Sequence, residues 1–246
     1  MANQFDPRIA YPRATGVAAG DASYDAGLRS YMLSVYNYMA SGVLLTGVVA
    51  LLFARGGAES WAAQIFMQPG ILKWIVMLAP FALVMVLSFG INKLSETQAK
   101  GLFWLYAALM GASLSTILLV YTGASVASTF FATAAGFGAL SLYGYTTKRD
   151  LSGMGKFLLM GLVGLIIASL INVFTQSSTM SLIISVVGVF LFAGLTVYDT
   201  QKIKEMYYQV QGSEMIGKTI IMGALTLYLD FINLFLFLLR FMGDRR

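Results

Sequence analysis

The chain has 246 residues, of which 58% are hydrophobic and only 11% are charged. A soluble domain carries about 25% charged residues, so this composition predicts a membrane protein. The formal net charge is +5, but no basic helix or stripe is present, and we expect no nucleic acid partner. Neither Cys nor His occurs, which excludes disulfides, thiolate or His-ligated zinc sites and His-based catalytic triads. We therefore expect no enzymatic activity and no cofactor.

The first segment, residues 1–32, is polar and mixed in charge. It has no early apolar stretch, which argues against a cleaved signal peptide. We expect residues 1–32 to form a polar cytosolic tail, loosely attached to the rest of the chain.

Seven apolar runs follow, each close to the length of about 20 residues that a helix needs to cross a bilayer. Such runs favour helices over the ten-residue alternating strands of an outer-membrane barrel. Their connections are short, so we predict an all-α, multi-pass membrane protein with one seven-transmembrane-helix bundle over residues 33–246. The predicted spans are Leu33–Ala54, Leu72–Ile91, Gly101–Tyr121, Val126–Tyr145, Phe157–Phe174, Ser181–Gln201 and Thr219–Phe241.

The basic residues are unevenly distributed between the two sides of these spans. Of the 16 Lys and Arg residues, 11 fall on the side of the amino terminus and 5 on the other side. By the positive-inside rule the amino terminus is cytosolic. Seven crossings leave the carboxyl terminus outside, although the basic tail after Arg240 leaves open a last span that re-enters the cytosol.

Two aspartates lie inside predicted spans. A carboxylate in the middle of a membrane helix costs about 2.5–3.5 kcal/mol on insertion scales, so each should face protein or an aqueous path. Asp199 lies about 12 Å inside the interface marked by Tyr207, and Asp230 about 15 Å from Arg240, at 1.5 Å per residue. The two acids are therefore predicted at similar depth on adjacent antiparallel helices.

Each aspartate belongs to a stripe of small and polar residues at helical spacing. Ordinary small-residue packing explains the Ser, Thr and Gly members of both stripes, whereas a buried acid is too costly for that purpose. The stripes contain Ser181, Ser185, Gly188, Phe192, Thr196 and Asp199 on one helix, and Thr219, Gly223, Thr226, Asp230, Asn233, Phe237 and Arg240 on the other.

If the two aspartates meet, their charge states are coupled. Two carboxylates in a low-dielectric site cannot both ionise at low cost, so we expect them to share one proton. Loss of that proton adds repulsion between the two helices. A divalent cation can take its place, and Ca²⁺ suits carboxylate and carbonyl oxygens. Asp199 and Asp230 thus form a predicted proton-controlled cation gate and a possible Ca²⁺ contact.

Other polar residues in the spans allow two interpretations. Asn37, Ser41, Asn92, Ser169 and Asn172 either line the same cavity or bond neighbouring backbone groups, and the second interpretation is favoured.

The segment Gly212–Thr219 matches the G-x-x-x-x-G-K-[ST] phosphate-loop pattern. That loop requires a buried strand before it and a soluble domain around it. Here a predicted membrane helix lies on either side, so we expect no nucleotide binding.

The two acid-bearing segments resemble bacterial members of the transmembrane Bax-inhibitor-motif (Bax inhibitor-1-like) family. The residues that carry this resemblance are Val197–Ile203, with the sequence VYDTQKI, and Gly223–Leu236, with the sequence GALTLYLDFINLFL. The seven-helix layout over Leu33–Phe241 fits as well, and the resemblance implies residence in a bacterial cytoplasmic (inner) membrane.

The resemblance implies a seven-helix bundle that passes Ca²⁺ in a pH-sensitive leak, with Asp199 and Asp230 as the proton sensor. Some relatives steady the pair with a basic residue at the cytosolic end of the second span. This chain has Asn92 there, followed by Lys93, which would have to turn inward to supply a salt bridge. Other bacterial relatives are linked to a membrane-bound protease and to stress responses.

Our leading hypothesis is a pH-sensitive calcium or cation leak channel in the lipid bilayer. Its gate is the pair Asp199 and Asp230, and the transported ion is Ca²⁺ rather than a bound cofactor. The supporting polar residues are Thr196, Thr226, Asn233, Asn92 and Lys93. The alternative is a regulatory membrane protein that binds and modulates a membrane-bound protease or stress-response partner through its polar tail.

Overall fold

The structure is a computed structural model that describes residues 15–246, with side chains from residue 26 onward. Helices account for all regular secondary structure in this range, and no β-strand is present within it. The helices are α1 (Thr15–Ala54), η1 (Gly57–Glu59, a 3₁₀ turn), α2 (Trp61–Phe66), α3 (Leu72–Gly90), α4 (Glu96–Val120), α5 (Gly123–Thr146), α6 (Ser152–Thr175), α7 (Ser178–Val210) and α8 (Ile216–Met242).

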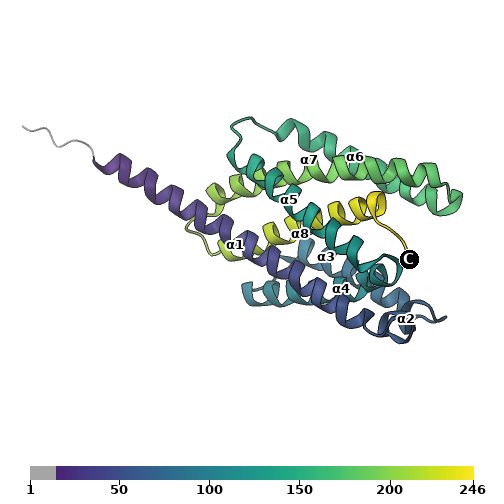
Figure 1. Ribbon diagram of the computed structural model, residues 1–246. Coiled ribbons are helices and arrows are strands. Elements are labelled where there is room, and N and C mark those ends of the chain that lie inside the picture. Colours follow the sequence, from purple (N-terminus) through teal and green to yellow (C-terminus); the bar gives the residue numbers. More distant parts are fainter. Residues whose placement is uncertain (1–14) are drawn as a thin grey trace, which may run out of the picture.

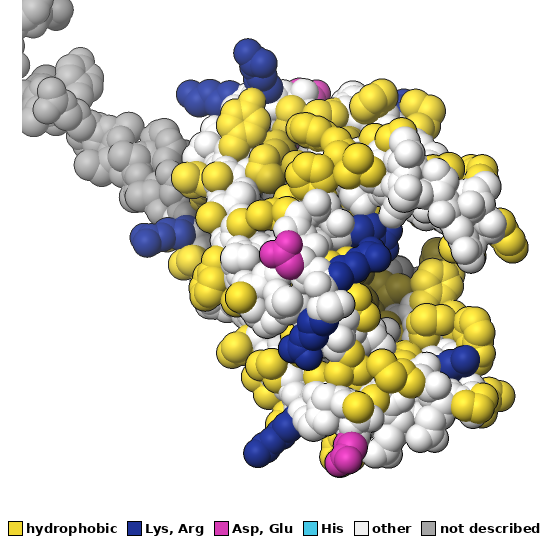
Figure 2. Space-filling view, turned by 45° about the vertical axis from the view of Figure 1, so that its right-hand side comes forward, with side chains coloured by type: hydrophobic (Ala, Val, Ile, Leu, Met, Phe, Trp, Pro, Cys, Tyr) yellow, Lys and Arg dark blue, Asp and Glu magenta, His cyan; other side chains and the backbone are white. Residues whose placement is uncertain are grey.

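Seven helices are long and apolar enough to cross a membrane: α1 and α3 to α8. This confirms the predicted all-α, seven-helix membrane architecture. Helix α2 is a short helix in the connection between the first two spans. Hydrophobic side chains cover much of the face in Figure 2, as expected where lipid is the solvent.

The predicted boundary at residue 33 is wrong for the described part of the tail. Helix α1 begins at Thr15, and Leu28, Tyr31 and Met32 are already buried in the core. A hydropathy run finds only the lipid-facing stretch, whereas the helix continues through polar residues that hydropathy does not detect. The part of the predicted tail before residue 15 lies outside the described residues.

Short polar side chains set several helix starts. Ser95 accepts a hydrogen bond from the Gln98 backbone N–H at 3.2 Å, and the Gln98 side chain accepts one from the Ser95 N–H at 2.9 Å. This reciprocal capping box begins α4. Thr122 and Ser177 cap α5 and α7 in the simpler way, each accepting from a backbone N–H three residues later.

Helix α8 is the centre of the bundle. It packs against α1, α4, α5 and α7, and it is seen between α1 and α5 in Figure 1. Helices α3 and α6 are peripheral, since α3 packs mainly on α4 and α6 packs on α7. A residue on α8 is therefore far more enclosed than a residue at the same depth on α3 or α6.

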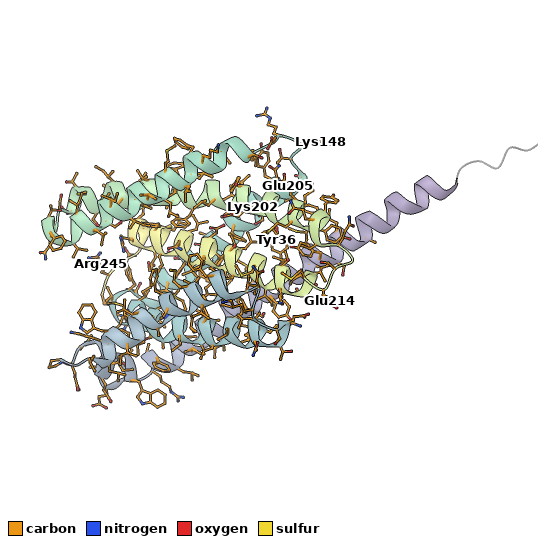
Figure 3. All side chains as sticks on the ribbon, turned by 180° about the vertical axis from the view of Figure 1, so that it is seen from behind. Tyr36, Lys148, Lys202, Glu205, Glu214 and Arg245 are labelled. Atoms are coloured by element: carbon orange, nitrogen blue, oxygen red, sulfur yellow. The ribbon has the colours of Figure 1, made fainter. Side chains whose placement is uncertain are left out.

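The two ends of the described chain lie at opposite faces of the bundle. Tyr31 on α1 packs on Tyr207 near the end of α7, with ring centroids 5.3 Å apart. The residues after α8 instead meet the α4–α5 connection, where the Thr122 N–H donates to the Asp244 carbonyl at 3.1 Å. Figure 3 shows Arg245 at the end opposite to the one from which α1 projects. Because α8 crosses without interruption, the re-entrant last span is ruled out.

Candidate functional site: an intramembrane aspartate pair

The contact between α7 and α8 sets the register of the site. The Phe192 and Phe237 rings stack across it, with centroids 5.7 Å apart. Gly188 lies directly under Phe237, where a Cβ atom would collide with the ring. Asp199 lies seven residues after Phe192, and Asp230 lies seven residues before Phe237. In antiparallel helices, equal steps of about two turns bring the two aspartates to the same level.

Asp199 on α7 and Asp230 on α8 are neighbours across this contact. Each carboxyl group is close enough to act on the charge of the other. Asp199 is half-buried, whereas Asp230 is only 4% exposed. The Asp230 Oδ2 atom is buried and has no hydrogen-bond partner.

No salt bridge neutralises the pair within the part of the chain that the structure describes. The one ion pair there joins Lys100 and Glu96 on α4, at 2.5 Å. Lys202 is the cation that acts on Asp199, since it follows three residues later on the same helix face. Its side chain is exposed and forms no ion pair with the carboxylate. Neither carboxyl group therefore has a basic residue paired with it among the described residues.

The three polar residues predicted to support the pair from the same helices bond their own backbones. Thr196 donates to the Phe192 carbonyl at 2.7 Å, and Thr226 donates to the Met222 carbonyl at 3.0 Å. The Asn233 side-chain amide donates to the Leu229 carbonyl at 2.8 Å. Local bonding of this kind is the favoured use of a polar side chain inside a helix that packs in a membrane.

The latch expected from Asn92 and Lys93 is not formed. Both side chains are exposed just beyond the end of α3, and neither has a hydrogen bond or ion pair with either aspartate. The reason is the position of α3, which packs on α4 at the edge of the bundle.

The wider polar cavity considered from sequence is not assembled either. Asn37 is exposed, and Ser41 and Ser169 donate to carbonyls of their own helices at 2.9 and 2.7 Å. The Asn172 side chain accepts from the Ser177 N–H at 3.1 Å and so stabilises the α6–α7 turn. Ser41, Ser169 and Asn172 thus follow the favoured interpretation, in which a polar residue bonds nearby backbone.

The phosphate-loop match lies in the turn between α7 and α8. Gly212 has a φ of 74°, and α8 begins at Ile216, so Lys218 and Thr219 are in its first turns. A helix, rather than the strand that a phosphate loop requires, precedes the segment.

Two contacts near the pair were missed from the sequence. The Tyr228 hydroxyl pairs with Thr46 on α1 at 2.6 Å. Gln201 fixes the α5–α6 loop, because its side chain accepts from the Leu151 N–H at 2.9 Å and donates to the Arg149 carbonyl at 2.8 Å. Helical periodicity would have placed Tyr228 on the face of α8 opposite Asp230, but nothing local names its partner.

The pair offers few ligands to a metal ion. Among the described residues, no group of three or more acidic residues lies close enough together to hold a metal ion. Asp199 and Asp230 together offer two carboxylates, fewer than the six to eight oxygens that Ca²⁺ takes in a resident site.

Comparison with known proteins identifies the family of this chain. The sequence pattern of the family described as "Inhibitor of apoptosis-promoting Bax1" matches residues 28–246, which include all seven spans. The chain belongs to the Bax inhibitor-1 family. The match begins at Leu28, where the buried core of α1 also begins.

Several bacterial relatives of this family are similar over nearly the whole chain. A protein of Rickettsia prowazekii is 48% identical over 97% of this chain and 99% of its own length. The inner membrane protein YbhL of Escherichia coli K12 is 49% identical over 90% of this chain and 94% of its own. A membrane protein of Streptococcus pyogenes is 38% identical over 89% and 94%, respectively. The chain is thus an integral membrane protein of the Bax inhibitor-1 family, and none of these three relatives is named for an enzymatic activity.

Proposed function

We propose that this protein is a pH-sensitive calcium or cation leak channel, gated by Asp199 and Asp230. The observation that carries the proposal is the buried carboxyl group of Asp230 on α8. It lies next to Asp199 on α7, and its Oδ2 atom has no hydrogen-bond partner. An acid inside a membrane span is expensive, and a purely structural bond there is available more cheaply from Asn or Gln.

Proton loss is the proposed opening step. With one shared proton the two carboxyl groups attract each other and hold α7 against α8. Without it, two adjacent negative charges in a low-dielectric site repel and favour separation of the helices. The same charges attract a divalent cation, so a higher pH both loosens the contact and makes it selective for cations.

The half-buried position of Asp199 supports access from one end of the bundle. Asp199 precedes Lys202 and Glu205, which are exposed on the same helix and labelled in Figure 3. The proposed orientation follows the distribution of basic residues and makes this end cytosolic. Asp230 is the more enclosed member and forms the inner part of the proposed gate.

The test is Ca²⁺ flux into liposomes that contain the purified chain. Wild-type flux is expected to rise as the pH increases from about 6 to 8, the range in which a coupled carboxyl pair can titrate. Asp199→Asn and Asp230→Asn should each remove the pH dependence. Glu205→Gln is the matched control, because Glu205 is an exposed acid on α7 outside the pair. Pure protein without cation flux at any pH, or pH-dependent flux in both Asn variants, would refute the gate.

A regulatory role is the second candidate, and one feature of the fold favours it. Helix α1 begins at Thr15 and projects beyond the bundle (Figure 1), so the amino-terminal end offers a helical arm to a membrane partner such as a protease. Deletion of residues 1–24 separates the two functions. A channel keeps its flux after the deletion, whereas a regulator loses capture of its partner.

A further inference from the structure

A long apolar groove lies between α1 and α5, with α8 as its floor. Its volume is about 700 Å³. Leu33 and Leu44 line it from α1, Ala134 and Leu142 line it from α5, and Phe231 lies at its base. The first four of these side chains are exposed, so the groove opens sideways toward the bilayer.

The groove continues toward the opposite membrane face. A second cavity of about 340 Å³ shares Val43, Phe130 and Phe231 with the first. On α1, the first cavity extends from Arg29 to Leu44, which is about 22 Å at 1.5 Å per residue. That length exceeds the depth of one leaflet, which is roughly 15 Å, or half of the hydrocarbon core.

Charge is confined to one end of this groove. Among the residues whose side chains the structure describes, Arg29 is the only charged one that lines either cavity. Beside it, Tyr145 lines the groove and carries a second cation, because Lys204 Nζ donates to the Tyr145 carbonyl at 2.8 Å and lies 5.3 Å from its ring centroid. The remaining lining is apolar apart from the hydroxyl groups of Tyr36, Ser141 and Thr46.

We propose that this groove binds one phospholipid with an anionic headgroup. An acyl chain lies between α1 and α5, and the phosphate meets Arg29, with Lys204 close by. The groove has a cationic end and a long apolar part, and this matches the polarity of a phospholipid with its anionic headgroup and its acyl chains. The volume also favours a chain over a helix, because a helix about 10 Å wide and 22 Å long would need roughly 1,700 Å³. This proposal is independent of ion conduction.

The groove can be filled from within by a side chain. A Cβ atom added at Gly138, which lines the groove, would meet nothing within 4 Å. Gly138→Leu should therefore fold normally while its side chain occupies the path of the acyl chain. Gly136 offers a matched control, since it is exposed on the same helix, has equally open space and lies outside both cavities.

The experiment is native mass spectrometry of the purified full chain with dioleoylphosphatidylglycerol or dioleoylphosphatidylcholine. The wild type should retain one phosphatidylglycerol in preference to phosphatidylcholine. Gly138→Leu should lose most of the retained lipid, whereas Gly136→Leu should keep it. Melting temperatures close to wild type for both variants show that the loss does not come from unfolding.

Arg29→Gln tests the headgroup contact. Removal of one basic residue near an anionic surface weakens binding by about 1 kcal/mol, so phosphatidylglycerol affinity should fall roughly fivefold while phosphatidylcholine is unaffected. Lys148→Gln, at the same end but outside the groove, should change neither. Equal retention in Gly138→Leu and wild type, no lipid preference in the wild type, or a dimer that Gly138→Leu separates would each overturn the proposal.

Discussion

Tyr228 and Asp230 are two residues apart on α8, and both are buried. The hydroxyl group of Tyr228 is hydrogen-bonded, whereas one carboxyl oxygen of Asp230 has no hydrogen-bond partner. Tyr228 is 0% exposed and Asp230 is 4% exposed. A step of two residues turns a helix by about 200°, so the two side chains face different neighbours. Tyr228 points toward α1 and α4, whereas Asp230 points toward α7.

The hydroxyl group of Tyr228 is hydrogen-bonded. Thr46 donates its single hydroxyl proton to the Ala107 carbonyl at 2.8 Å, so the Tyr228 hydroxyl donates to Thr46 at 2.6 Å. The ring also packs edge-on against Phe103 and Tyr106. This network connects three helices, and a fully satisfied buried network rigidifies the structure around it.

The polar group of Asp230 is only partly used, because Oδ2 has no partner and the neighbour is a second acid. A buried group in this state stabilises the fold poorly but responds strongly to a change of charge. Tyr228 therefore makes a structural contact, whereas Asp230 is a charge-sensitive group on the same helix. Substitutions at the two positions should have different effects.

The largest expected effect is on stability after Tyr228→Ala. Removal of a fully buried aromatic ring leaves a cavity and should cost about 3–5 kcal/mol in the free energy of unfolding. Thermal unfolding in detergent measures this loss. Tyr208→Ala is the control, because Tyr208 is 49% exposed and should change stability little. Similar losses for both tyrosines would contradict the structural role of Tyr228.

Tyr228→Phe removes only the hydroxyl group. Thr46 keeps its bond to Ala107, so the expected loss of stability is about 1 kcal/mol, the usual net value of one hydrogen bond. The pH dependence of Ca²⁺ flux should remain as in the wild type. A flux that no longer responds to pH would show that the two sites on α8 are not separate.

Asp230→Asn should act in the opposite direction on stability. The amide adds a donor for Asp199 and removes the second acid, so we expect no loss, or a gain of up to about 1 kcal/mol, in unfolding measured at pH 8. The same variant is expected to lose its pH response in the flux assay. A strong destabilisation would place Asp230 with Tyr228 as a structural residue.

The smallest effect is expected at Asp150, a fully exposed acid in the α5–α6 loop. Hydrogen bonds from the Ser152 hydroxyl and backbone N–H hold the pKa of Asp150 below its ordinary value of 3.8. Its contribution to stability is present above that value and is lost as the pH falls below it. Asp150→Asn should therefore leave flux between about pH 6 and 8 unchanged and lower the melting temperature slightly at neutral pH.

Several features of this fold could be predicted from local sequence, for local physical reasons. Run length and hydropathy identified seven crossings, because a helix in lipid must satisfy its own backbone over the full hydrocarbon thickness. The spacing of Asp199 and Asp230 from their interface residues placed them at one depth, because the rise per residue is fixed. Hydropathy did not find the amino-terminal part of α1, since its polar residues do not lie in an apolar run.

The sequence by itself determined that this is a seven-helix membrane protein with two acids at the same level. Only the tertiary structure decided which helices surround α8, and with it which polar groups are satisfied. That choice joins Tyr228 to Thr46, leaves Asn92 and Lys93 at the edge, and opens the groove between α1 and α5. The physical reason is that lipid is as apolar as the helix surfaces, so hydropathy fixes depth, whereas close packing and hydrogen bonding fix the neighbours.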